Sequence, residues 1–314
     1  MNMVIGAVTM GFILVPLALG LFVSYRIYHT LDLTTDGAFG VGLAVVAALM
    51  VREFSPVTAT AVGVLAGMIA GAITGTVHTR LRVSALLAGV LTTTALYSVD
   101  LFVMGGGNIS LARNESLMTL ADRIGQGVFG IPAELTILGT TVSGASLATM
   151  MMTGLLAAAL ALGLVYFLGT DLGLAMRASG NNPRMAKAVS IEVDRMVVFG
   201  LGLANGLTAL SGALLAQYSG FANISMGFGM VVTGVATLMV GETLLGRRPL
   251  GRWVGGAVAG AVVFQLIIGL AIKAGLNPNA LKLVTTLFVL AVIVMPDLVR
   301  AGRRRLKPKV ASHA

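Results

Sequence analysis

The chain has 314 residues, of which 57% are hydrophobic and 11% are charged. Soluble domains carry about 25% charged residues, so this composition excludes an ordinary soluble protein and indicates an integral membrane protein. The net charge of +9 does not indicate a nucleic-acid partner, because the basic residues lie between hydrophobic runs and form no continuous face. The chain has no cysteine and therefore no disulfide, thiolate metal site or cysteine nucleophile.

Apolar runs long enough to cross a bilayer recur along the chain. The clear ones cover residues 4–25, 55–77, 86–104, 146–168, 196–217, 253–272 and 280–297, and two short or glycine-broken ones cover 37–50 and 230–245. They predict an all-α, polytopic membrane protein with about nine transmembrane helices, between eight and ten. No long soluble block separates them, so we expect a single domain over residues 1–314 with a basic tail at 298–314.

Basic residues are distributed unevenly between the two sides that nine crossings define. One side, which includes the tail, holds 16 of the 21 Lys and Arg residues, and the other side holds five. Because cytoplasmic loops are enriched in these residues, we expect the C-terminus in the cytoplasm and the N-terminus outside. The first apolar run lacks the basic start and cleavage pattern of a signal peptide, so we interpret it as a retained span.

The polar entry to the second span is the densest cluster of costly groups in the chain. Asp32, Thr34, Thr35 and Asp36 precede an apolar helix of only about fourteen residues. Asp36 is placed to cap that helix. Capping does not explain why the helix is short, whereas a broken span that lines an aqueous path explains both features.

The third span carries glycines at spacing four, which form a ladder on one helix face: Gly63, Gly67, Gly71 and Gly75. Such a face lets another helix approach closely. Tight packing within the chain is the favoured interpretation, and a dimer seam is the alternative. In the long outer loop, 105–144, the stretch "ESLMTLADRI" is weakly amphipathic, so it is a candidate for a short surface helix that faces an external partner.

Further polar residues lie near the outer side. Asp100 stands within one or two turns of the outer surface, where it either bonds to a neighbouring span or lines the outward path. Asn108 belongs to "GGNISL", which recurs loosely as "FANISM" at 221–226 and is weak evidence for an internal duplication. Glu242 lies close in sequence to Arg247 and Arg248, which predicts an ion pair at the interface.

Motifs of catalysis are absent from the sequence. There is no phosphate-binding loop of the G-x-x-x-x-G-K-[ST] type, no G-x-S-x-G elbow and no H-E-x-x-H motif. The three histidines stand far apart, with no spacing suited to a shared metal ion. We therefore expect no enzyme activity, no catalytic residue, no metal and no cofactor bound by this chain.

The polar run "GNNPRMAKAVSIEVDR", residues 180–195, interrupts the membrane pattern near the middle of the chain. Pro183 is well placed for the first position of a helix, and the Asn-Pro start distinguishes this segment from a plain connector. A solvated connector is nevertheless the simplest interpretation of such a run when it is considered alone.

Several stretches together resemble a known family. "LDLTTDGAFGVG", "HTRLRVSALLAGVLTTTALYSVDLFVMGGGNI", "MRASGNNPRMAKAVSIEVDR", "LANGLTALSGALLAQYSGFANISMG" and "VGETLLG" cover most of residues 30–250. In order and spacing they are similar to permease subunits of bacterial ABC importers in the branched-chain amino acid and ribose permease superfamily. The tryptophan/tyrosine-type permeases are the more similar subgroup. Asp32 and Asp100 stand where that family more often has neutral polar residues.

The resemblance implies a type II ABC importer-like fold in the bacterial inner membrane. It implies a cytoplasmic ATPase dimer that binds the ATP, an extracytoplasmic solute-binding protein and a second permease copy, with a homodimer expected. The implied cargo is a small solute, an amino acid or a related compound. Independently of the resemblance, the cost of placing polar groups in lipid predicts a translocation path that includes Asp32, Thr34, Thr35, Asp36, Asp100 and Asn108. The implied ATPase coupling helix includes Gly180, Asn182, Pro183, Arg184, Met185, Ala186, Val189 and Ile191, with an apolar patch centred on Ala186. The alternative is a secondary transporter in which Asp32, Asp36 and Asp100 bind protons or sodium.

Overall fold

The computed structural model describes residues 2–127, 132, 134–137, 140–246, 249–276, 280, 283–287 and 290. Its helices are α1 (Asn2–Leu21), the π-helical η1 (Phe22–Ile27), α2 (Thr34–Val51), α3 (Pro56–Arg80), α4 (Ala85–Met104), α5 (Leu117–Gly127), α6 (Gly144–Gly169), α7 (Asp171–Asn181), α8 (Pro183–Ala188), α9 (Val193–Ser219), the 3-10 turn η2 (Ile224–Gly227), α10 (Met230–Leu245) and α11 (Leu250–Lys273). Its short strands are β1 (Asn108–Ser110), β2 (Glu134–Ile137), β3 (Thr140–Ser143) and β4 (Phe221–Asn223).

Eight helices in the described part of the chain are long and apolar enough to span a membrane. Each corresponds to one of the eight apolar runs predicted before residue 273, which confirms the polytopic, all-α fold class. The ninth predicted run, 280–297, lies largely outside the described residues, which include only 280, 283–287 and 290 of it.

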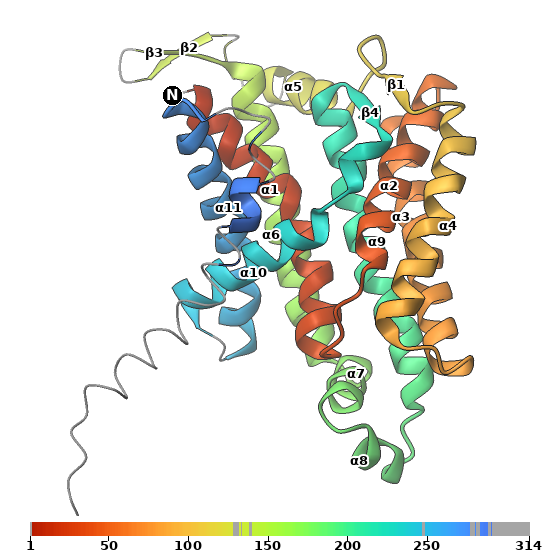
Figure 1. Ribbon diagram of the computed structural model, residues 1–314. Coiled ribbons are helices and arrows are strands. Elements are labelled where there is room, and N and C mark those ends of the chain that lie inside the picture. The colour runs from red at the N-terminus through yellow and green to blue at the C-terminus, as the bar shows by residue number, and fades with distance from the viewer. Residues whose placement is uncertain are drawn as a thin grey trace, which may run out of the picture.

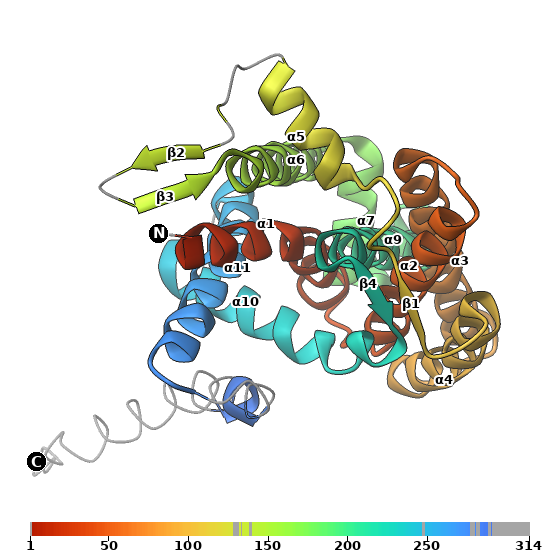
Figure 2. The same ribbon diagram turned by 90° about the horizontal axis from the view of Figure 1, so that it is seen from above.

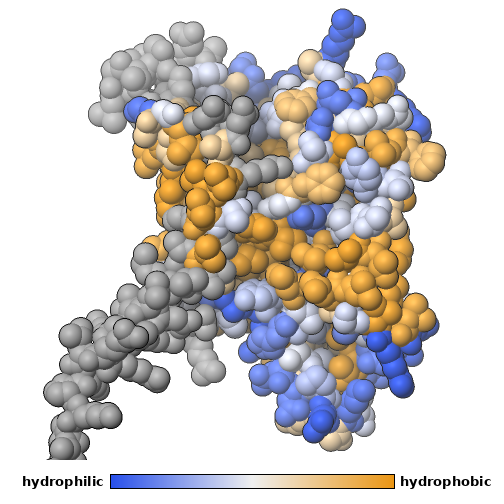
Figure 3. Space-filling view, in the orientation of Figure 1, coloured by the Kyte–Doolittle hydropathy of each residue, from blue (hydrophilic) through white to orange (hydrophobic). Residues whose placement is uncertain are grey.

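The long helices run up and down between two ends of the molecule (Figure 1). The N-terminus, α5 and the four strands lie at one end, called here the N-terminal end. The short helices α7 and α8 lie at the opposite end, called here the α8 end. Hydrophobic side chains form a band across the middle of the face seen in Figure 3, and hydrophilic ones gather around α7 and α8. This distribution fits a membrane around the long helices and water at both ends.

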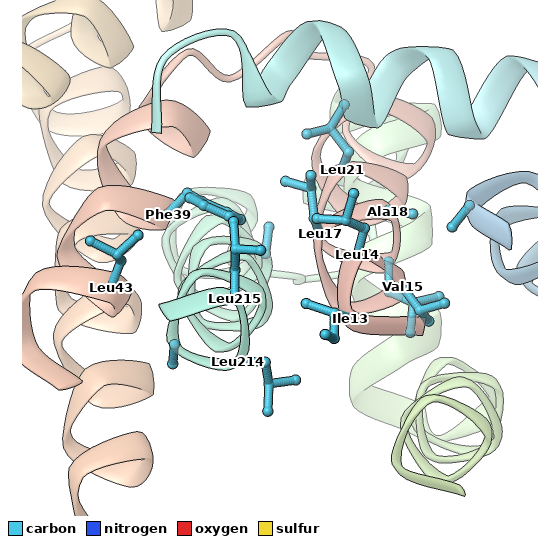
Figure 4. Close-up of a cluster of buried hydrophobic side chains, with 14 of the residues drawn as sticks. Ile13, Leu14, Val15, Leu17, Ala18, Leu21, Phe39, Leu43, Leu214 and Leu215 are labelled. Atoms are coloured by element: carbon cyan, nitrogen blue, oxygen red, sulfur yellow. The ribbon is translucent and has the colours of Figure 1, made fainter. Parts of the chain in front are cut away.

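Helix α9 is the centre of the packing. Seen from above, it lies between α1 on one side and the α2, α3 and α4 group on the other (Figure 2). Buried apolar side chains from α1, α2 and α9 fill the space between these helices (Figure 4). They include Ile13, Leu17, Phe39, Leu43 and Leu214. Because α9 is enclosed by other helices, groups that project from it can be polar without meeting lipid.

The surface segments include one predicted element and one that was not foreseen. Helix α5 lies within the stretch that was interpreted as a candidate surface helix. Strands β2 and β3 form an antiparallel hairpin beside it, with Leu135 opposite Val142. The ends of the helices follow local capping rules: Ser55 and Ser84 accept hydrogen bonds from the backbone at the starts of α3 and α4.

The glycine ladder of α3 packs inside the chain. A methyl group added at Gly71 would lie 2.2 Å from the carbonyl oxygen of Leu201 on α9, and one at Gly67 would lie 2.3 Å from Cβ of Ala209. Gly75 faces Val198 on α9 in the same way. The opposite face of α3 carries exposed apolar residues such as Leu65, Ile69 and Ile73. Of the two alternatives left by the sequence, the ladder therefore serves close packing within the chain, with Gly63 against Gly42 and Val46 of α2 and the other three glycines against α9.

This packing gives a direct prediction. Gly71→Ala should lower the stability of the protein by about 1–3 kcal/mol, because the added methyl group overpacks the contact with α9. Val62→Ile, which enlarges a side chain on the exposed face of the same helix, should change stability little. Thermal unfolding of both variants in detergent measures the difference. Equal melting temperatures would show that the two helices are not in tight contact.

Candidate functional site

The second span begins inside the membrane layer. The chain leaves η1 at the α8 end and turns back through residues 28–33 before α2 begins at Thr34. Thr34 Oγ1 lies 2.8 Å from Thr74 Oγ1, six residues before the end of α3 at Arg80. At a rise of 1.5 Å per residue, α2 starts about 9 Å deeper than α3 ends. The predicted polar start of the second span agrees with the structure, but α2 has 18 residues, and Thr34, Thr35 and Asp36 form its first turn instead of preceding it.

The Asp32 carboxylate is buried, with 4% of the residue exposed, and it accepts hydrogen bonds from two elements. Its Oδ2 lies 2.7 Å from Nδ2 of Asn205 on α9. Its Oδ1 lies 2.9 Å from the backbone nitrogen of Thr34. Asp32 thus binds the first turn of α2 and ties it to α9. The sequence predicted that Asp36 caps this helix, whereas the hydrogen bond from the Thr34 backbone nitrogen goes to Asp32.

Hydroxyl groups extend this network to two further helices. Thr74 on α3 bonds to Thr34 and also donates to Thr92 on α4, at 2.9 Å. Thr93 on α4 donates to the backbone carbonyl of Leu33, at 2.8 Å. Thr34 and Thr35 are both buried. The start of α2 is therefore held by α3, α4 and α9 in a polar but closed environment.

Asp36 bonds to a different helix. Its carboxylate accepts hydrogen bonds from the backbone nitrogens of Gly229 and Val231, at 3.0 and 2.8 Å. These groups begin α10, whose chain enters from the N-terminal end through β4 and η2. The N-termini of α2 and α10 therefore meet at Asp36 from opposite ends of the protein. Helix N-termini carry partial positive charge, which suits the carboxylate there.

Asp100, on α4, lies closer to the N-terminal end than Asp36 does. Its residue is 4% exposed, and it faces Gly40 on α2, where an added methyl group would lie 2.7 Å from Oδ2. Asp100 and Asp36 line the same small cleft. The cleft is bounded by Asp36, Gly37, Gly40, Thr93, Tyr97, Asp100, Ile224, Gly227 and Phe228. Of the predicted path residues, these two acids share one cleft, whereas Asp32 and Thr34 belong to the buried network.

Asn108 stands apart at the N-terminal end. It lies in β1, which pairs antiparallel with β4, so that Asn108 is opposite Asn223 and Ile109 is opposite Ala222. The two similar stretches noticed in the sequence are therefore partners in one small sheet. Strand β4 continues directly into η2, so this sheet joins the surface to the cleft that contains Asp36 and Asp100.

An ion pair that the sequence did not predict lies near the α8 end. Glu242 on α10 pairs with Arg26 of η1, with the Arg26 Nη2 to Glu242 Oε2 distance at 2.7 Å. Trp253 donates to Glu242 at 3.0 Å, and its ring meets Phe22 edge-on, with centroids 5.0 Å apart. The predicted ion pair of Glu242 with Arg247 and Arg248 lies outside the described residues.

The polar run after α7 forms a short helix as predicted. Asn182 caps α8 by accepting a hydrogen bond from the backbone nitrogen of Met185, at 3.1 Å, and Pro183 takes the first helical position. Met185 and Val189 are each 60% exposed, whereas Ala186 is fully buried. The exposed apolar surface is therefore formed by Met185 and Val189, and Ala186 cannot be its centre.

Gly180 and Ile191 also differ from the surface role that was expected of them. A methyl group at Gly180 would lie 2.0 Å from the carbonyl oxygen of Ile27, so Gly180 is a close contact between α7 and η1. Ile191 is partly buried, and its backbone nitrogen bonds to the Ala186 carbonyl at 3.0 Å. Arg184 and Lys187 are exposed to solvent.

Comparison with known proteins identifies the family. A family model described as "Branched-chain amino acid transport system / permease component" matches residues 3–295. The chain belongs to this family. The resemblance seen in the sequence is thereby confirmed, and the chain is a membrane-embedded subunit of a transporter.

Individual relatives of this permease agree with the family. It is 30% identical over 313 residues to the tyrosine transport system permease protein of Clostridioides difficile (strain R20291), covering 99% of this chain and 98% of the relative. An uncharacterized protein of Rickettsia prowazekii (strain Madrid E) is 30% identical over 289 residues, covering 90% and 94%. The autoinducer 2 import system permease protein of Yersinia pseudotuberculosis (serotype O:1b, strain IP 31758) is 25% identical over 295 residues, covering 93% and 76%. No solved structure gives a significant match.

The buried network of this permease can be tested by a double-mutant comparison. Asn205→Ala removes the donor to Asp32 and should lower stability by about 1.5–3 kcal/mol, because a carboxylate is left buried without that partner. Adding Asp32→Asn to it should restore part of the loss, since the remaining side chain is neutral. Thermal unfolding in detergent measures both, with the exposed Asn181→Ala as a control. If the stability losses caused by Asn205→Ala alone and by Asp32→Asn alone simply add in the double variant, the Asp32–Asn205 hydrogen bond does not hold the turn.

Proposed function

We propose that this permease is the membrane subunit of an ATP-driven importer that moves an amino acid or a related small solute inward. Its partners are a cytoplasmic ATPase dimer, an extracytoplasmic solute-binding protein and a second copy of the chain. The observation that carries the proposal is the small helix α8 at one end of a family permease, with Met185 and Val189 exposed. The chain itself binds no cofactor, since ATP is bound by the partner ATPase.

The surface of α8 suits docking into a groove. A short helix with a few exposed apolar side chains, framed by polar ones, is a common mode of helix recognition. Met185 and Val189 stand four residues apart and so lie on one face of the helix, and Arg184 and Lys187 frame them. Buried Ala186 and the Asn182 cap fix the orientation of this face on the permease.

The path of the solute is assigned to the region where α2 and α10 begin. Helices that start within the membrane, with irregular backbone before them, occur where protein or a water-filled cavity surrounds that backbone. Asp36 and Asp100 line a cleft there, and Asn108 lies at the N-terminal end. The burial of Thr34 and Thr35 corresponds to a closed state of this path, so solute passage requires the surrounding helices to move.

The cargo is proposed to be an amino acid because a relative at 30% identity is named a tyrosine transport permease. The N-terminal end is assigned to the outside of the bacterial inner membrane, where the solute-binding protein docks. The α8 end is assigned to the cytoplasm, because basic residues concentrate there. A sodium- or proton-coupled transporter is the competing function. It is less favoured because Asp32 and Asp36 already accept hydrogen bonds from their own chain.

The orientation can be tested in the cysteine-free chain by introducing one cysteine at a time. We expect Arg52→Cys, in the turn between α2 and α3, to react with a membrane-impermeant maleimide in intact cells. We expect Lys187→Cys, on α8, to react only after the membrane is permeabilised. Both positions are exposed, so burial cannot explain a difference between them. The reverse pattern would invert the assignment of the two ends.

The ATPase contact can be tested by placing charge on the exposed apolar surface of α8. Met185→Glu/Val189→Glu should reduce co-purification of the cognate ATPase at least tenfold and abolish uptake, because two carboxylates replace the apolar contact. Stability should change by only about 0.5 kcal/mol, since both side chains are exposed. Lys187→Gln on the same helix is the matched control and should retain the ATPase.

Ala186→Glu is not a suitable test of the ATPase contact, because the residue is fully buried and its replacement is expected to disturb α8 itself.

The double variant also separates the two candidate functions. Uptake that continues normally in Met185→Glu/Val189→Glu, without bound ATPase, would contradict the ATP-driven mechanism and favour ion coupling.

A further inference from the structure

The Asp100 carboxylate differs from the other acids at membrane depth. Only 4% of the residue is exposed to solvent, and it lines the cleft beside Gly40. Among the described residues, no hydrogen bond or ion pair to this carboxylate is found. A buried charge without a partner is strongly disfavoured, so such a group at membrane depth is a candidate for binding a ligand.

The described residues that line the cleft around Asp100 supply no positively charged side chain. Asp36, the other acid of the cleft, accepts hydrogen bonds from Gly229 and Val231 at the start of α10. The residues that line the cleft, all within the described part of the chain, include neither Lys nor Arg. Two carboxylates would repel an anion that entered this cleft. A cation would instead pair with Asp100, whose carboxylate has no partner among the described residues.

Aromatic rings form the outer wall of the same cleft. Tyr97 on α4 and Phe228 after η2 have ring centroids 5.8 Å apart at a tilt of 34°. Both are partly exposed, at 40% and 49%. Ring faces attract cations, and the attraction is stronger for a desolvated ammonium group. A carboxylate behind two aromatic rings is the combination that suits an amino group attached to an apolar body.

We propose that Asp100, with Tyr97 and Phe228, forms a selectivity site that receives the ammonium group of the cargo. The inference rests on the proposed transport function and narrows its substrate class to amines and amino acids. Gly40 lets α2 approach the carboxylate closely, because any side chain at this position would press against Oδ2 of Asp100. In this arrangement, Asp36 maintains the start of α10 and Asp100 selects the charge of the solute.

A charge-selective labelling experiment tests the site without a known cargo. Ile224→Cys places the only thiol of the full-length chain in the cleft without removing Tyr97, Asp100 or Phe228. Its reaction rates with the cationic reagent MTSET and the anionic reagent MTSES are compared in the purified complex. We expect cation preference, and we expect Asp100→Asn to lower the ratio of the two rates about tenfold, as a unit charge at this range predicts. Asp122→Asn, a partly exposed acid on α5, should leave the ratio unchanged.

Protection from labelling then tests recognition of the amino group. Tyramine, which has an amine and no carboxylate, should slow MTSET labelling of Ile224→Cys. Hydroxyphenylpropionate, which has a carboxylate and no amine, should not, and Asp100→Asn should remove the tyramine effect. An unchanged reagent ratio in Asp100→Asn, or equal protection by both compounds, would overturn the proposal.

The ATPase activity of the same complexes keeps this result separate from the transport function. Asp122→Asn, the control on α5, should retain the basal ATPase activity and the melting temperature of the parent, which checks that the complex is intact. If labelling fails to show charge selectivity while ATP is still hydrolysed by the complex, only the selectivity site is refuted. If the purified permease carries no ATPase at all, the proposed function itself fails.

Discussion

The hydrogen bond between Asp32 and Asn205 is the contact on which the centre of this protein depends. A turn that re-enters the membrane layer exposes backbone and side-chain polar groups where water is scarce, and each unsatisfied group costs several kcal/mol. Asp32 and Asn205 resolve this by joining the first turn of α2 to the enclosed helix α9. Thr74 of α3 bonds to the Thr34 hydroxyl, and Thr93 of α4 donates to the backbone carbonyl of Leu33. The broken span is thus stable because four helices share its polar groups.

Fixing α2 in this way determines where α10 can begin. Two helices that start at depth from opposite ends bring two positive N-termini together, and this arrangement is unfavourable without a negative group between them. Asp36 supplies that group and accepts hydrogen bonds from α10 while belonging to α2. The electrostatics of the centre is therefore balanced before any solute enters. Asp100 adds a further negative charge to the same cleft, and this charge is not required by the packing.

The sequence predicted the features that depend on local composition, and it failed where distant residues meet. Eight spans followed from apolar runs, and the start of α8 followed from an Asn-Pro pair. The partners of Asp36 and Glu242 lie about two hundred residues away along the chain, so neighbouring sequence could not reveal them. The prediction that the apolar patch is centred on Ala186 was wrong for a related reason. A six-residue helix gives too little periodicity to separate its buried face from its exposed face, and contacts with α7 and α9 decide it.

The contacts around η1 connect α8 to the polar turn. Gly180, just before α8, touches the carbonyl of Ile27, and the next residue, Tyr28, packs against Gly200 and bonds to the Met196 carbonyl on α9. Four residues later the chain reaches Asp32. Spatial continuity alone does not transmit a signal, and a movable element is also needed. The π-helical turn η1 is assigned this role, because π-helical turns interrupt the α-helical hydrogen-bond pattern and occur often at functional sites. In the proposed mechanism, a displacement of α7 and α8 by the ATPase acts on the start of α2 through η1, whose residues Phe22, Val23 and Ile27 belong to the buried core.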